Sequence, residues 1–103
     1  MTIPNGSLTV GTSITCVSLT ETSDAAAKQD VEDVADASRI LRVRPVTYRV
    51  AGDTDGPLHA GVIAQEVEAV MPECVRILDS GLKGVEYQHL TMMLLKYTQE
   101  LAA

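Results

Sequence analysis

The sequence contains no tryptophan and no phenylalanine, and tyrosine occurs only at Tyr48, Tyr87 and Tyr97. The core must therefore be built from aliphatic side chains and methionine. With 103 residues and 46% hydrophobic content, the chain fits one small domain, and a domain of this size can bury only a modest core. We therefore expect self-association to provide additional buried surface.

Basic residues are also scarce, with 8 Lys and Arg against 14 Asp and Glu, and the formal net charge is −6. Nucleic acid is an unsuitable partner for such a chain, because phosphates attract basic surfaces. Half of the basic residues nevertheless fall in one short region: Arg39, Arg42, Arg44 and Arg49. This cluster could hold a phosphate or a partner's carboxylates, but a solvated or salt-bridged face is the commoner arrangement.

Cysteine occurs twice, at Cys16 and Cys74, without CxxC or metal-ligand spacing. We therefore expect two reduced thiols, no metal and no other cofactor. The chain has no run of about 18 apolar residues, and its first residues lack the basic region and unbroken apolar stretch of a signal peptide. These absences predict a soluble protein made in a cytosol, with no membrane partner.

The remaining residues predict a mixture of short strands and helices. Residues 7–20 are β-branched and hydroxyl-rich with rough alternation, which indicates a strand or hairpin. Residues 24–41 are good helix formers, with acidic residues near the start and arginines near the end. Two hairpins are expected further on, from residues 46–50 with 59–63 and from residues 74–78 with 83–87. Between them, residues 64–71 predict a short helix that Pro72 ends.

The C-terminal residues 88–103 predict an amphipathic helix with one apolar stripe, formed by Leu90, Met93, Leu94, Tyr97 and Leu101. Such a stripe could face the core of the same chain, or it could pack against the same helix of a sister chain as in a coiled coil. Both alternatives remain open from the residues alone.

Individual residues within these elements also have structural interpretations. Tyr48 and Tyr87 are expected in the core, and His89 is expected to be structural. Gly61 and Gly84 lie in strand-like contexts, where a missing side chain allows a bulge or a close backbone approach.

The stretch TETSDAAAK, residues 20–28, has two interpretations. Thr22, Ser23 and Asp24 are all good N-cap residues before an alanine-rich helix. Alternatively, Ser23 is a nucleophile and Lys28 its base. Residues five apart on an ideal helix lie roughly 140° around the axis. A Ser–Lys pair therefore requires that Ser23 precede the helix, or that the lysine come from another chain.

Downstream segments carry a resemblance to a known family. Four segments follow the order and spacing of one known domain: LRVRPVTYRV (41–50), LHAGVIAQEVEAVMPECV (58–75), KGVEYQHL (83–90) and the closing helix. The chain resembles the intramolecular chaperone domain, an auto-processing peptidase, at the C-termini of phage tailspikes, endosialidases and tail fibres. The resemblance covers residues 19–103. Its opening serine, aspartate and lysine correspond to Ser23, Asp24 and Lys28, whereas alanines occupy positions 25–27, where the family commonly has an arginine.

The resemblance implies an α+β fold in an intertwined homotrimer, with an N-terminal helix, small β-hairpins, a short middle helix and a long C-terminal helix. Residues 1–22 would be the β-rich end of an upstream fibre or tailspike, and residues 23–103 the chaperone domain. This domain would bring three chains into register, with the upstream chain as its folding client, and then cut itself off at Thr22–Ser23. Assembly would take place in the host cell cytoplasm, and the fibre part would remain in the virion tail.

The chemistry that the resemblance implies is a Ser–Lys reaction. Lys28, if desolvated and partly neutral, removes the proton of Ser23, whose oxygen attacks the carbonyl of Thr22. In the shared HxGxxAQE segment, His59 could donate a hydrogen bond to the oxyanion, and Gln65 and Glu66 could position the pair. For each of these three residues, a purely structural contact is the alternative.

Two other functions compete with self-cleavage. The first is a structural trimerisation or receptor-binding tip that is never cleaved, in which Ser23 is only a helix cap. The second is a Ser–Lys peptidase that acts on other proteins. A foreign substrate requires a binding cleft, and a short chain with so few aromatic residues is a poor candidate for one. We therefore rank the second alternative last.

Overall fold

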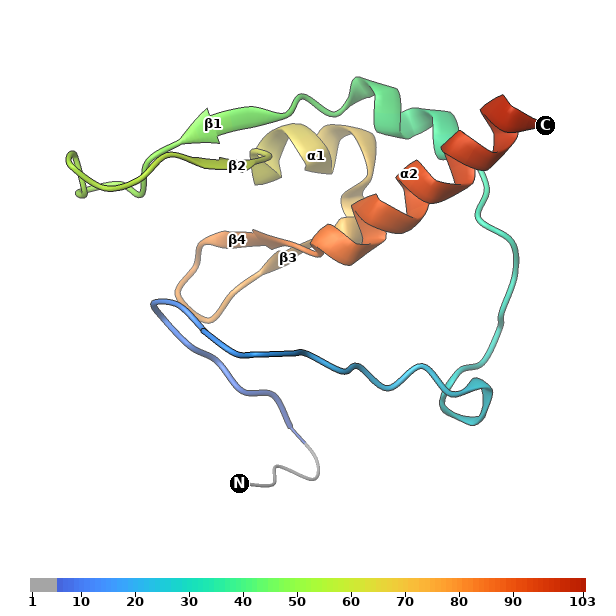
Figure 1. Ribbon diagram of the computed structural model, residues 1–103, viewed down its shortest axis with the longest axis horizontal. Helices are drawn as coiled ribbons and strands as arrows, with labels where there is room; N and C mark the ends of the chain where they lie inside the picture. Colours follow the sequence, from blue (N-terminus) through green and yellow to red (C-terminus); the bar gives the residue numbers. More distant parts are fainter. Residues whose placement is uncertain (1–5) are drawn as a thin grey trace. The chain divides into compact units, whose positions relative to one another are not determined.

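The structure is a computed structural model that describes residues 6–103 (Figure 1). The chain divides into two compact units, Met1–Val31 and Glu32–Ala103, and each is described here by itself. Residues 1–5 of the predicted stalk segment lie outside the described residues.

The described residues before the cleavage-site candidate, residues 6–22, form no helix and no strand. The prediction of a strand or hairpin over residues 7–20 is therefore wrong for the single chain. Apolar side chains of this segment, including Ile14, Val17 and Leu19, are exposed. Alternating side chains create a face, but a strand also requires a neighbour that pairs with its backbone and covers that face. No such strand occurs among the described residues of this unit.

The predicted helix over residues 24–41 is also wrong. Two short 3-10 helices occupy its ends, η1 at Ala25–Ala27 and η2 at Ala37–Arg42, and the intervening residues are exposed and non-helical. Asp30 and Asp36 between them adopt left-handed backbone conformations, with φ of 55° and 53°. A helix of this length needs an apolar face packed against something, because propensity alone gives marginal stability. Like charges four residues apart, as at Glu32 and Asp36, weaken it further.

Both predicted hairpins in the second unit are confirmed. β1 (Val46–Tyr48) pairs antiparallel with β2 (His59–Gly61), in a register that places Val46 opposite Gly61. β3 (Val75–Ile77) pairs antiparallel with β4 (Lys83–Val85), in a register that places Val75 opposite Val85. The connecting turns contain glycines with positive φ, 89° at Gly52 and 85° at Gly81, which a glycine adopts without steric cost.

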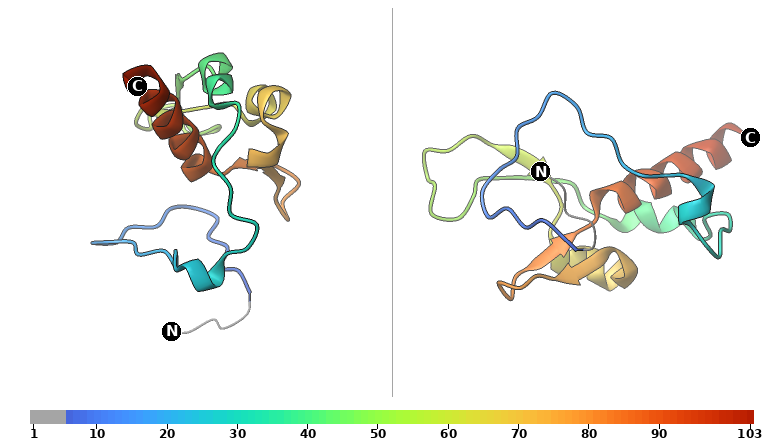
Figure 2. Two further views of the ribbon diagram at one scale, coloured as in Figure 1. Left: turned by 90° about the vertical axis from the view of Figure 1, so that its right-hand side faces the viewer. Right: turned by 90° about the horizontal axis from the view of Figure 1, so that it is seen from below.

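Two helices and a 3-10 turn supply the core of this unit (Figures 1 and 2). They are α1 (Ala64–Val70), η3 (Pro72–Cys74) and α2 (Tyr87–Ala102), and α1 ends where Pro72 was predicted to end it. One buried cluster joins them, formed by Val67, Met71, Cys74, Leu90 and Met93. Ile40 and Val43 from η2 and its C-cap pack against this cluster, and η2 lies alongside α2 in both figures. The unit is thus α+β, with small antiparallel hairpins and a C-terminal helix.

The apolar stripe of α2 is divided along its length. Leu90 and Met93 are buried in the core, with 8% and 2% of their surface exposed. Tyr97 is half-buried, whereas Leu94 and Leu101 remain 54% and 69% exposed. The first turns of the helix therefore belong to the core of this chain, and the apolar residues further along face outward.

The two tyrosines that were expected in the core lie at its edge, with Tyr48 43% and Tyr87 49% exposed. The expectation that both lie in the core was therefore wrong. Both phenol rings instead lie against the backbone at Gly61. The Tyr87 hydroxyl accepts a hydrogen bond from the Val62 amide at 3.0 Å. A Cβ atom at Gly61 would lie only 2.5 Å from the Tyr87 oxygen and 3.1 Å from Tyr48 Cε1. The close approach predicted for Gly61 is thus confirmed, and a Cβ atom at Gly84 would lie 3.2 Å from Leu78 Cδ2, which is a tight but less severe contact.

This contact predicts that Gly61→Ala will destabilise the folded domain by about 1–3 kcal/mol through overpacking. The cost should fall in a Tyr87→Phe background, because the closest atom to the new methyl group is then absent. Urea denaturation of the two single variants and the double variant measures this difference.

Gly11→Ala is the matched control, since nothing lies within 4 Å of a Cβ at Gly11. An equal cost of Gly61→Ala in both backgrounds would show that the Tyr87 hydroxyl does not set the constraint.

Candidate functional site

Ser23 and Lys28 come together around η1. The Lys28 amine donates a hydrogen bond to the Ser23 hydroxyl oxygen, with 2.6 Å between Nζ and Oγ. Ser23 precedes the turn and Lys28 is its C-cap residue, with extended backbone angles (φ −124°, ψ 147°). The two side chains therefore meet across a turn. Within an α-helix, residues five positions apart would point in different directions and would not meet.

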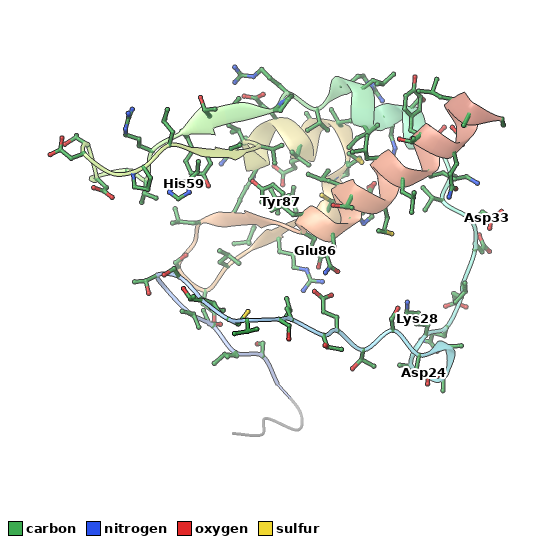
Figure 3. All side chains as sticks on the ribbon, in the orientation of Figure 1. Asp24, Lys28, Asp33, His59, Glu86 and Tyr87 are labelled. Carbon is green, nitrogen blue, oxygen red and sulfur yellow. The ribbon has the colours of Figure 1, made fainter. Side chains whose placement is uncertain are left out.

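The N-cap of η1 is Asp24 rather than Ser23. The Asp24 carboxylate accepts a hydrogen bond from the Ala26 amide at 2.8 Å, and its backbone carbonyl accepts one from Ala27 at 2.9 Å. Figure 3 shows Asp24 and Lys28 at this turn. Of the three candidate caps, Thr22, Ser23 and Asp24, the N-cap is thus Asp24. The Ser23 hydroxyl instead accepts the hydrogen bond from Lys28.

Both members of the pair are exposed in the single chain. A lysine acts as a base only when its amine is uncharged, and burial favours the uncharged form. The desolvation that Lys28 would need to act as a base is therefore not provided by the described residues of its own unit.

The other three candidate residues lie in the second unit. His59 begins β2 and is exposed (Figure 3). Its ring stacks on that of Tyr48, with ring centroids 5.4 Å apart. Gln65 is exposed in the first turn of α1. His59 thus makes a structural contact, which was the alternative to a catalytic role. The catalytic roles of His59, Gln65 and Glu66 stay predictions.

Glu66 is held by a two-point ion pair with Arg44. Arg44 Nε lies 3.0 Å from Glu66 Oε1, and Arg44 Nη2 lies 2.6 Å from Glu66 Oε2. The hydrogen bonds from this guanidinium, together with its charge, hold the pKa of the Glu66 carboxyl below its usual range. This pair joins the start of α1 to the segment before β1, which gives Glu66 a structural role.

Other arginines of the sequence cluster also have partners within the chain. Arg39 pairs with Glu73 at 2.8 Å, and Arg49 donates to the carbonyl of Gly56 at 3.1 Å. The interpretation as a salt-bridged face is therefore confirmed for Arg39 and Arg44. His89 lies in the first turn of α2, where its amide donates to the Glu86 carbonyl at 3.0 Å.

Both cysteines are free thiols: Cys16 is exposed and Cys74 is buried. Burial raises the pKa of the Cys74 thiol, which suits a core residue rather than a nucleophile. No cluster of three or more His, Cys, Asp or Glu residues suited to a metal ion occurs within residues 6–103. Over the same range, no helix has the length and apolar character that crossing a membrane requires.

A comparison with family models identifies the relatives of this chain. Residues 23–76, more than half of the sequence, match the model of a peptidase family described as the chaperone of endosialidase. The chain belongs to this family. The match begins at Ser23 and extends over η1, η2, the first hairpin, α1 and η3 into β3. Among curated proteins, no sequence matches the chain.

Membership confirms the resemblance given by the sequence and makes this a peptidase-related chaperone domain. Sequence reasoning found Ser23 and Lys28 through the spacing of the motif. It missed the Arg44–Glu66 pair, because nothing in the spacing of two residues 22 positions apart indicates contact. It also left the cap undecided among Thr22, Ser23 and Asp24, since all three types are good caps.

The Arg44–Glu66 pair predicts a pH effect with a definite sign. Because the pKa of Glu66 is lowered in the folded state, the pair stabilises the fold above the ordinary carboxyl pKa of about 4.3, and this stabilisation is lost as the pH falls. In Arg44→Met, the Glu66 pKa should rise toward its ordinary value. Carboxyl ¹³C chemical shifts measured against pH test this expectation.

Arg42→Met is the matched control, because it removes a positive charge two residues before Arg44 in the sequence but keeps the ion pair. If Arg44→Met left the Glu66 titration unchanged, the pair would not be the cause of the lowered pKa.

Proposed function

We propose that this domain is an intramolecular chaperone that brings three copies of a phage tail-fibre or tailspike chain into register and then releases itself by cutting the Thr22–Ser23 bond. The observation that supports this most directly is the 2.6 Å contact between Lys28 Nζ and Ser23 Oγ, at the residue where the family match begins. The client is the chain upstream of Ser23. Assembly takes place in the host cytoplasm, and the upstream part becomes the virion tail fibre.

The proposed cleavage begins with Lys28 in its uncharged form. Its Nζ accepts the hydroxyl proton of Ser23 along the observed contact, and Ser23 Oγ attacks the carbonyl carbon of Thr22. The bond between the Thr22 carbon and the Ser23 nitrogen then breaks, and the nitrogen takes the proton back from the Lys28 ammonium. Thr22 is now joined to Ser23 Oγ as an ester. Water hydrolyses this ester to give the Thr22 carboxyl group and the free Ser23 hydroxyl.

A modest site is sufficient for this reaction. A cut made once, with a half-life of about an hour, requires a barrier of only ~22 kcal/mol, against ~16 kcal/mol for ten turnovers per second. The nucleophile and the attacked carbonyl belong to neighbouring residues, so proximity provides a large share of the catalysis without a substrate pocket. An exposed pair is compatible with this demand.

Assembly into a trimer would provide what the single chain lacks. Large apolar side chains are exposed along α2, including Leu94, Leu95 and Leu101. Packing them against sister helices would enlarge a core that holds only six buried hydrophobic residues among those described. Burial of Lys28 in the assembled state would favour its uncharged form, so that cleavage follows assembly.

Self-processing predicts that the purified full-length chain will yield a fragment that starts at Ser23. Ser23→Ala and Lys28→Ala should both abolish this fragment, because one removes the nucleophile and the other the base. Intact mass spectrometry over a day at neutral pH measures the outcome.

Ser18→Ala is the matched control, since it removes an exposed hydroxyl from the same unit and should cleave like the unmodified chain. If the unmodified chain and Ser23→Ala both stay whole, the domain is a non-cleaving trimerisation or receptor-binding tip.

Trimer formation through α2 predicts that Leu94→Asp and Leu101→Asp will dissociate the assembly and slow cleavage at least tenfold. A charge on an apolar contact would be buried without a partner in the trimer. Sedimentation velocity and intact mass spectrometry of the same samples give the oligomeric state and the cleavage rate.

Gln99→Asp adds the same charge at an exposed residue outside the stripe and should keep both properties. A monomer that cleaves at the normal rate would contradict the proposed order of assembly and cleavage.

A further inference from the structure

The turn that brings Ser23 and Lys28 together has little to stabilise it besides its own hydrogen bonds. It comprises only Ala25–Ala27, and none of its residues is buried. Alanine side chains cannot donate or accept hydrogen bonds, so the turn depends on its backbone and on its cap. The backbone provides bonds from the Ala27 amide to the Asp24 carbonyl and from the Lys28 amide to the Ala25 carbonyl, at 2.9 and 3.2 Å.

The Asp24 carboxylate provides the side-chain contribution to this turn. Its Oδ1 accepts the Ala26 amide at 2.8 Å, which satisfies one of the amides that a helix start leaves without a partner. Replacing an N-cap aspartate by alanine typically lowers the population of the capped turn by about 2- to 30-fold. The loss should have a measurable effect here, because η1 buries none of its own residues that could compensate for the lost bond.

The turn also determines whether the two reactive groups can meet. In an extended chain, the Cα atoms of residues five apart lie roughly 17 Å from one another. The 2.6 Å contact between Lys28 Nζ and Ser23 Oγ is therefore favoured by a chain that reverses between them, as it does at η1.

We infer that Asp24 is a positioning residue for self-cleavage, which acts by capping the turn that holds Lys28 against Ser23. This inference rests on the proposed function. The carboxylate touches the Ala26 amide rather than the reacting atoms, so its role is conformational. The required property is a side-chain oxygen that accepts a hydrogen bond, and the negative charge is not needed.

Substitution by asparagine and by alanine separates these two properties. Asparagine keeps an acceptor oxygen and caps as well as aspartate, whereas alanine removes the cap. We therefore expect Asp24→Ala to cleave about 2- to 30-fold more slowly than the unmodified chain, and Asp24→Asn to stay within about 2-fold of it. Full-length chains are compared by intact mass spectrometry, with Ser23→Ala as the non-cleaving reference and Asp30→Ala as the matched removal of an acidic residue outside the turn.

Amide hydrogen exchange in a Ser23→Ala background measures the cap apart from catalysis. Protection of the Ala26 amide should be lost in Asp24→Ala and kept in Asp24→Asn. An Asp24→Ala chain that cleaves at the normal rate would overturn the inference while leaving the proposed function intact. If Asp24→Asn is as slow as Asp24→Ala, charge rather than capping is responsible, which also overturns it. If the unmodified chain is never cleaved, both proposals fail together.

Discussion

One small apolar cluster holds the second unit together. Val67 and Met71 from α1 and its C-cap, Cys74 from η3 and Leu90 with Met93 from α2 are all buried against one another. Ion pairs such as Arg39–Glu73 and Lys83–Glu68 lie around it with partly exposed side chains. Exposed pairs of this kind contribute about 0–1 kcal/mol each, so the cluster must provide most of the stability. Both hairpins are short, and an isolated two-stranded hairpin is at best marginally stable, so the packing of β3 and β4 against α1 supports the second one.

The candidate site is stabilised in a different way. It is formed by consecutive residues of the first unit, and η1 buries none of its side chains. The turn is therefore stabilised by local hydrogen bonds, whereas the second unit is stabilised by the packing of apolar side chains. A site of this kind is easily opened and closed, which would suit the single cut proposed above. The family match covers parts of both units, since it extends from Ser23 into β3.

The success of sequence-based prediction varied along the chain for physical reasons. The two hairpins, α1 and α2 were predicted because turn residues, Pro72 and a regular apolar stripe mark their limits within the chain itself. The strand over residues 7–20 and the helix over residues 24–41 were not found, because alternation and propensity give structure only when something covers the apolar face. The pairing of Ser23 with Lys28 was suggested by the family motif, which left open whether the lysine comes from the same chain, whereas the Arg44–Glu66 pair depends on tertiary folding and left no local signal.

The compact extent of the Ser–Lys turn has a consequence for how such a domain can be combined with other proteins. Ser23, Lys28 and the Asp24 cap of η1 lie within six consecutive residues. The only upstream group that the proposed reaction uses is the carbonyl of Thr22. Every peptide unit has such a carbonyl, so the chemistry demands no particular sequence before the cut. Under the proposed function, the domain carries its own cleavage site, so that fusing it to a different upstream chain would transfer the whole reaction to that chain.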